Sequence, residues 1–220
     1  MEDSKLTVAY WPVQGVSHPI RLLLSYFKVP FEDKFYTGKE DWFMSDKLKL
    51  KSPMPNLPYI KDGDIILTES LACLQYAALK TGQRDLLGKN DLDSIRIFQV
   101  WGIARELQLT IGQLAWNRDH EKDKPTVLKD KIEPLLAKLS KGLGDQEYFL
   151  EYLTWPDFIV AYLVDLVSRL KEESVTALPN LVKHHERIYS NEGIQTYRKS
   201  EKYPKCFTVH LATWEGPEKM

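Results

Sequence analysis

The chain has 220 residues, of which 43% are hydrophobic and 28% charged, and its formal net charge is -1. This composition is typical of a soluble globular protein with one large or two modest domains. The near-neutral charge without a broad basic stripe argues against nucleic acid as the main partner, and no apolar run is long enough to insert into a membrane.

The N-terminal sequence MEDSKLTV has neither a basic nor an apolar leader region, so no signal peptide is expected. Cys73 and Cys206 lie far apart without a C-x-x-C pattern, which indicates neither a disulfide framework nor a zinc site. His184 and His185 are adjacent, and adjacent helical residues point in different directions, so they are not expected to share a metal. The expected location is the cytoplasm.

The first segments predict a β-α-β unit. Residues 6–10 read as a strand that ends in the loop 11–15, Ser17 precedes a helix over 19–27, and residues 29–35 can form a second strand. Tyr10 would lie at the carboxyl end of the first strand, where open α/β sheets place ligand groups. From position alone, a half-buried strand aromatic is the stronger interpretation.

The stretch from Lys47 to Ser70 predicts a hairpin followed by a helix. Pro55 and Pro58 hold the backbone extended before an apolar run, and Asp62-Gly63-Asp64 supplies a tight turn. The segment 71–79 has helical length and contains neither Gly nor Pro. The order β-α-β-α-β-β-α predicts a small α/β domain with a mixed sheet.

This stretch also predicts an anion site. Ser70 would lie at a helix N-terminus, where exposed N–H groups and the helix dipole favour negative charge. Lys47, Lys49 and Lys51 add positive charge upstream, and the extended backbone at Leu57 could pair with a peptide as a sheet edge does. We therefore expect a small anionic peptide as ligand. The alternatives are a solvated lysine face and a plain helix cap.

The second half predicts an all-helical region after a polar linker over 83–90. Apolar residues recur on one helix face at Ile103, Leu107, Ile111 and Leu114. A further helix is expected over 125–139.

Thr154 and Asp157 have the spacing of a capping box, and Leu153 and Phe158 occupy the two staple positions around it. The helix that follows is apolar nearly all round, so it should be the buried centre of this region. Asp157 is therefore expected to be structural and not catalytic.

An ordered set of motifs spans nearly the whole chain. It consists of Tyr10-Trp11 with Gly15 and the run 18–24, Lys47-Leu48-Lys49-Leu50, Pro55-Asn56-Leu57-Pro58-Tyr59, Thr68-Glu69-Ser70, Trp116-Asn117, Pro156-Asp157-Phe158, Leu178-Pro179-Asn180-Leu181, Tyr197-Arg198-Lys199-Ser200 and Trp214. The set resembles the cytosolic glutathione S-transferases, and the mu class most. The resemblance implies a thioredoxin-like domain over 1–82, the linker 83–90 and an all-helical domain over 91–220 that contributes the electrophile site.

The resemblance also implies residue roles. Tyr10 would stabilise the thiolate of glutathione, the co-substrate, for attack on hydrophobic electrophiles in detoxification, with no metal or bound cofactor. Glu69 departs from the glutamine of the mu pattern, but a carboxylate can still accept from the ligand's ammonium group. The residues implied to contact glutathione are Tyr10, Trp11, Trp42, Lys47, Asn56, Leu57, Pro58 (as a cis proline), Glu69 and Ser70.

The implied electrophile pocket consists of Pro12, Val13, Gln113, Trp116 and Val209. Trp116 stands where mu-like sequences have tyrosine, and packing in the core is the alternative for it. Met54 stands where an aromatic residue joins mu-like subunits, so a homodimer is expected. Two other functions stay open: a non-catalytic ligand-binding or structural protein of the same fold, and a glutathione-dependent isomerase or dehalogenase.

Overall fold

The computed structural model describes residues 5–209 and 212–214. Residues 1–4, on which the N-terminal interpretation partly rests, and residues 210–211 and 215–220, at the end of the expected helical domain, lie outside the described residues.

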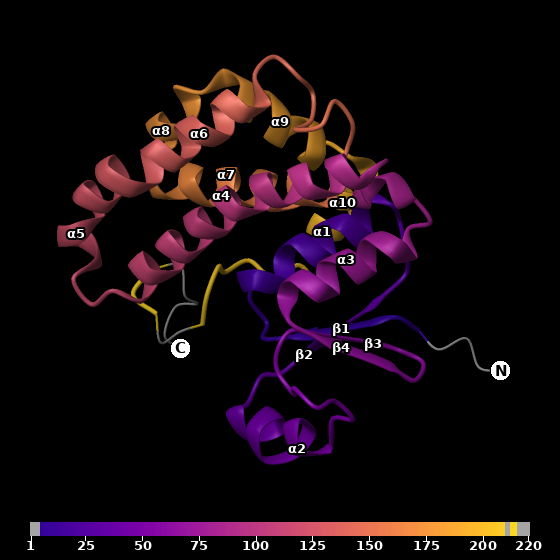
Figure 1. Cartoon of the computed structure of the whole chain (residues 1–220). Helices are drawn as coiled ribbons and strands as arrows, with labels where there is room; N and C mark the ends of the chain where they lie inside the picture. The colour runs from indigo at the N-terminus through magenta and orange to yellow at the C-terminus, as the bar shows by residue number, and fades with distance from the viewer. Residues whose placement is uncertain (1–4, 210–211, 215–220) are drawn as a thin grey trace.

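A four-stranded mixed sheet forms the N-terminal part of the fold (Figure 1). Its strands are β1 (Thr7–Tyr10), β2 (Glu32–Phe35), β3 (Tyr59–Asp62) and β4 (Ile65–Thr68), in the order β2-β1-β3-β4. β1 pairs with β2 in parallel, whereas the β1–β3 and β3–β4 pairs are antiparallel. The expected mixed sheet is confirmed.

The strand register gathers distant segments at one end of the sheet. Ala9 pairs with Tyr59, and Tyr59 pairs with Thr68. The end of β1, the start of β3 and the end of β4 therefore lie together. Tyr10, the last residue of β1, and Glu69, which directly follows β4, lie at this end.

Helices cover the sheet unequally on its two sides. α1 (His18–Tyr26) and α3 (Ser70–Lys80) lie between the sheet and the helical region, and the segment with η2 (Asp41–Asp46) and α2 (Lys47–Lys49) stands on the other side (Figure 1). The 3-10 turn η1 (Gly15–Ser17) leads into α1. Gly63 adopts a φ of 59° in the β3–β4 turn, a conformation that glycine reaches at little cost.

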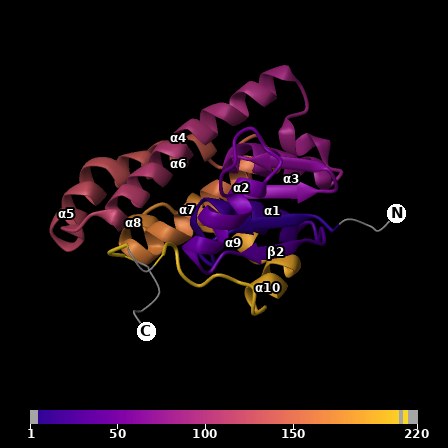
Figure 2. The same cartoon turned by 90° about the horizontal axis from the view of Figure 1, so that it is seen from below.

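The elements in the rest of the described chain are helices, as expected, and they follow the short 3-10 helix η3 (Arg84–Leu87), which buries Leu86. Its elements are α4 (Asp91–Trp116), α5 (His120–Val127), η4 (Leu128–Ile132), α6 (Glu133–Leu143), α7 (Trp155–Leu170), α8 (Glu172–Thr176), α9 (Pro179–Tyr189) and α10 (Glu192–Arg198). α4 and α6 run side by side (Figures 1 and 2). The expected linker over 83–90 contains η3 and the buried Leu86, so it is partly helical and packs against the core.

α7 is the buried centre of the helical region, and the predicted capping box holds its start. Oδ2 of Asp157 accepts hydrogen bonds from the Thr154 N–H and hydroxyl, both at 2.8 Å. Its Oδ1 lies 2.9 Å from Nε2 of His184 and accepts from the Phe149 N–H. Asp157 is fully buried in this network, which confirms its structural role.

Two expected elements have different bounds. The second strand begins at Glu32 and not at residue 29, because Pro30 has no N–H to donate to a ladder. The expected helix over 125–139 begins earlier, with Pro125 inside α5 and a π-helical turn, η4, directly after it. A proline inside a helix removes one backbone hydrogen bond, and π-helical segments occur mostly as single turns inside α-helices.

One hydrophobic core joins the sheet to the helical region. Val8, Ile60, Leu107 and Phe158, from β1, β3, α4 and α7, belong to the same cluster and are fully buried. This continuity fixes the face of α4 relative to the end of β1. In the described part of the chain, no helix has the length and apolar character needed to cross a membrane.

Candidate functional site

A cavity of about 890 Å³ lies between the end of β1, one face of α4 and the C-terminal segment. Its described lining residues are mostly apolar or aromatic: Tyr10, Trp11, Pro12, Val13, Gly15, Val16, Tyr36, Thr37, Lys39, Phe43, Arg105, Gln108, Leu109, Gly112, Gln113, Trp116, Phe207, Thr208 and Val209. All five residues expected at the electrophile pocket are among them. Trp116 is 52% exposed, so it does not pack in the core.

Tyr10 enters the cavity wall because the loop after it leaves room for its ring. Gly15 has a φ of 46°, and a Cβ there would lie 2.7 Å from Cε1 and 2.9 Å from Oη of Tyr10. The Gln14 and Gly15 N–H groups donate to the carbonyls of Cys206 and Phe207, at 2.8 and 2.9 Å. The C-terminal segment therefore holds the loop that follows Tyr10.

The surroundings of Tyr10 keep its phenol protonated. Burial raises the pKa of Tyr10 above its usual value of 10.0, whereas a hydrogen bond from the Val16 backbone and the Arg21 cation act in the opposite direction. The Arg21 guanidinium lies 5.9 Å from the centre of the Tyr10 ring. A phenol with a raised pKa retains its O–H at neutral pH and can donate it.

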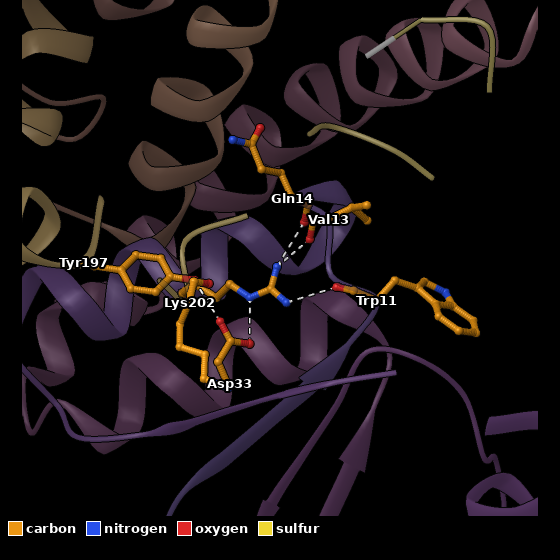
Figure 3. Close-up of polar contacts among 7 residues, drawn as sticks. Trp11, Val13, Gln14, Asp33, Tyr197 and Lys202 are labelled. Carbon is orange, nitrogen blue, oxygen red and sulfur yellow. Dashed lines mark hydrogen bonds and ion pairs between the residues drawn. The ribbon is translucent and has the colours of Figure 1, made fainter. Parts of the chain in front are cut away.

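The buried Arg21 of α1 fixes the loop through hydrogen bonds to its carbonyl groups (Figure 3). Nε of Arg21 donates to Oδ1 of Asp33 at 3.0 Å, and its Nη1 donates to the Val13 carbonyl at 2.7 Å. The Tyr197 hydroxyl donates to the second oxygen of Asp33 at 2.8 Å, and further Arg21 contacts reach the carbonyls of Trp11 and Gln14. A fully buried guanidinium is stable only with such partners.

Gln14 ties the same loop to α7 and to the C-terminal segment. Its side-chain amide donates to the Pro204 carbonyl at 3.0 Å, and its Oε1 accepts from Nη2 of Arg169 at 2.7 Å. Gln14 is buried. The loop is therefore held by side chains of α1 and α7 and by backbone carbonyls of the C-terminal segment.

The second group of expected residues meets at the start of β3 and the end of β4. Nδ2 of Asn56 donates to Oε1 of Glu69 at 2.9 Å, and the Leu57 N–H donates to Oδ1 of Asn56 at 2.9 Å. The Leu57–Pro58 peptide is cis. Glu69 has a φ of 70° just before α3, a rare conformation that clusters at functional sites, and Ser70 is the first residue of that helix.

The structure separates Trp42 from this surface. Trp42 is buried in an aromatic cluster with Tyr36 and Tyr59, and its ring stacks on Tyr59 at 6.0 Å between centroids. The next residue, Phe43, faces the cavity, and Nζ of Lys47 lies 5.5 Å from the centre of its ring. Residues four apart share a helix face and adjacent ones do not. The sequence-based choice of Trp42 as a ligand contact therefore corresponds, in the structure, to a core residue.

Both halves of the chain match models of one family. The description "Glutathione S-transferase, N-terminal domain" applies to residues 6–79, and "Glutathione S-transferase, C-terminal domain" applies to residues 105–201. The chain belongs to the glutathione S-transferase family. Members of this family are transferases, and the expected resemblance is thereby confirmed.

Mu-class transferases are among the curated relatives of the chain. It is 31% identical to glutathione S-transferase Mu 4 of Homo sapiens over 95% of this chain and 98% of that protein. It is 30% identical to glutathione S-transferase 2 of Gallus gallus over 96% of this chain and 98% of that protein. The Onchocerca volvulus Pi-class glutathione S-transferase shares the fold with a TM-score of 0.81 at 22% identity, covering 94% of this chain and 99% of that one.

Several residues on the wall of this glutathione S-transferase carry no sequence signal that we used. The resemblance implied Trp42 as a glutathione contact and implied no role for Phe43. Arg105, Gln108 and Phe207 are separated from Tyr10 by at least ninety residues of sequence, and only the fold brings them to one cavity. The four-residue spacing of Phe43 and Lys47 was the one available clue.

Proposed function

We propose that this chain conjugates the thiol of glutathione to hydrophobic electrophiles and that Tyr10 is its catalytic residue. The observation that carries the proposal is the protonated phenol of Tyr10 in the wall of a largely apolar cavity. A free thiol has a pKa of about 8.5, and its thiolate is the nucleophile. A phenolic O–H aimed at sulfur favours the thiolate, so more of the bound thiol is reactive at neutral pH.

Glutathione would lie along the end of the sheet, with its thiol at Tyr10. Leu57 offers extended backbone to the cysteinyl part, and its N–H, held by Asn56 in the free protein, would change partner on binding. Ser70 and the start of α3 suit the γ-glutamyl carboxylate, and Glu69 suits the ammonium group. Lys47, with Phe43 beside it, suits the glycine carboxylate.

The electrophile would occupy the cavity between Pro12, Val13 and the α4 face with Gln113 and Trp116. Sulfur attacks the electrophilic carbon, the bond to the leaving group breaks, and the leaving group departs with the electron pair. Because glutathione supplies the nucleophile, the reaction requires no metal or cofactor. The proposed location is the cytoplasm, and the free thiol of the buried Cys73 agrees with a reducing compartment.

The proposal includes a homodimer. Met54 is 66% exposed beside the sheet, and methionine adapts to apolar slots of varied shape. α4 also exposes Leu92, Ile95 and Phe98, at 55%, 63% and 45%, which recur every three residues. An exposed apolar residue and an exposed apolar helix stripe on one chain can cover each other in a two-fold pair.

The test is conjugation of glutathione to 1-chloro-2,4-dinitrobenzene by wild type and Tyr10→Phe. Loss of one charge-assisted hydrogen bond should lower kcat by about tenfold to a hundredfold. The affinity for glutathione should stay within a few-fold. Tyr76→Phe removes a hydroxyl that bonds Asp62, away from the cavity, and serves as the matched control. Equal turnover of Tyr10→Phe and wild type would remove Tyr10 from the mechanism.

A further inference from the structure

The described wall of the cavity carries positive charge and no acidic side chain. Among the described lining residues, Lys39 and Arg105 are cations and none is Asp or Glu. The chain as a whole has a formal net charge of -1, so this local excess does not follow from a basic composition. An anionic group that enters the cavity meets opposite charge and no like charge among these residues.

Arg105 has hydrogen-bond donors to spare. It is half-buried on α4, and its Nη1 donates to Oε1 of Gln108 at 2.8 Å. The arginines that pair with a carboxylate in the described part of the chain are others, namely Arg21, Arg96, Arg169 and Arg187. A guanidinium carries five N–H donors in a fixed plane, and a carboxylate takes two of them at once. Gln108 thus orients the Arg105 guanidinium, whose other N–H donors can bind an anion.

The cavity face of α4 changes character along its length. Its lining residues run from Arg105 and Gln108 to Leu109 and finally Trp116. From Arg105 to Trp116 the helix axis advances roughly 16 Å, at about 1.5 Å per residue. The charged group of this face, Arg105, lies at one end, and the exposed Trp116 ring lies at the other, next to the uncharged Gln113. This gradient matches a molecule with an apolar body and one anionic end.

We propose that the cavity prefers electrophiles whose apolar body carries a carboxylate, with Arg105 as the partner of that carboxylate and Gln108 as the residue that orients Arg105. The proposal rests on the transferase function proposed above. For an α,β-unsaturated ketone of this class, the thiolate sulfur bonds to the β-carbon and the π electrons move onto the carbonyl oxygen. The resulting enolate takes a proton from water at the α-carbon, so no oxidant or reductant is needed.

The experiment compares long-chain enones that end in a carboxylate with their methyl esters, which have nearly the same shape but no charge. The ratio of kcat/KM for acid over ester is measured for wild type and R105Q at low and high salt. Loss of a hydrogen bond to a charged group should lower this ratio about tenfold in R105Q. Salt should lower the wild-type ratio, since screening weakens a partly exposed ion pair.

Arg118→Gln is the matched control. It removes the same charge from an exposed residue near the end of α4 that does not line the cavity, and it should leave the ratio unchanged. An equal fall in Arg118→Gln would show a general charge effect and overturn the proposal. If the acid-over-ester ratio of kcat/KM falls in Lys39→Gln but not in R105Q, the assignment to Arg105 is overturned.

A binding measurement separates this proposal from the transferase function. Decanoic acid and its methyl ester cannot react, and Trp11 and Trp116 on the wall allow their binding to be followed by tryptophan fluorescence. Tighter binding of the acid, lost in R105Q, supports the anion site even if no electrophile is conjugated. Equal affinities of acid and ester in wild type overturn the anion site even if conjugation of neutral electrophiles is fast.

Discussion

The Cα of Gly15 lies against the ring of Tyr10 so closely that a Cβ at Gly15 would come within 2.9 Å of the phenolic oxygen. Gly15→Ala should therefore displace the phenol and lower kcat by tenfold or more, beyond a backbone strain of about 1 to 2 kcal/mol. Gly144→Ala is the control, because Gly144 has a similar φ of 58° and nothing described lies within 4 Å of its Cβ. Thermal unfolding and kcat are measured together. Similar loss of activity in both variants would contradict the steric explanation.

The pH profile should report the thiol and not the phenol. Because the pKa of Tyr10 is raised above 10.0, its O–H persists through the range in which the thiol ionises. At saturating glutathione, kcat/KM of wild type for the electrophile should rise with pH to a plateau. The midpoint of this rise should lie below the usual thiol value of about 8.5. In Tyr10→Phe the midpoint should move up to about 8.5. A wild-type decline between about pH 8 and 9.5 that the phenylalanine variant lacks would show early ionisation of Tyr10.

Trp42 and Phe43 should respond in opposite ways to truncation. Trp42 is 2% exposed and stacks in the core, so Trp42→Ala should lower the free energy of unfolding by roughly 3 to 5 kcal/mol. Phe43 is 47% exposed on the cavity, so Phe43→Ala should change stability little and raise KM for glutathione several-fold. Denaturant titration and steady-state kinetics check both. A stable Trp42→Ala variant with a raised KM would restore Trp42 as the ligand contact.

Trp116→Tyr should raise activity toward epoxides. A phenol can deliver a proton to the oxygen of an opening epoxide in the transition state, whereas an indole N–H is no useful acid. Wild type should act well on a chloronitrobenzene and weakly on epoxides. The ratio of kcat/KM for epoxide over chloronitrobenzene should rise in the tyrosine variant. If that ratio does not rise, Trp116 has no influence on this chemistry.

Met54→Asp should weaken the proposed dimer. A charge at a residue that fills an apolar slot must be desolvated on association, and this cost opposes pairing. Sedimentation at micromolar concentration should show a dimer for wild type and a shift toward monomer for the variant. Circular dichroism serves as the check that the variant subunit is folded. A wild-type monomer under these conditions would refute the interface.

Local sequence signals predicted the elements of this fold because their causes are local. Asp62-Gly63-Asp64 makes its turn through glycine's access to positive φ, and Thr154 with Asp157 closes a capping box within one helical turn. The resemblance assigned Tyr10, Glu69 and Ser70 to one ligand, and the register of β1, β3 and β4 brings the ends of β1 and β4 together. The predicted starts of the second strand and of the helix over 125–139 were wrong. The effects of Pro30 and Pro125 on the backbone depend on the residues around them.

The sequence by itself determined the element order, the family and the identity of the candidate nucleophile-activating tyrosine. Only the tertiary structure decided that Phe43 and not Trp42 faces the cavity, because the choice depends on which face of a short helical turn packs against Tyr59. The same holds for Arg21, whose partner Asp33 and loop carbonyls meet it through the pairing of β1 with β2. Arg105 reaches the cavity only because a continuous core sets α4 over the end of β1, and no local pattern encodes contacts across such distances.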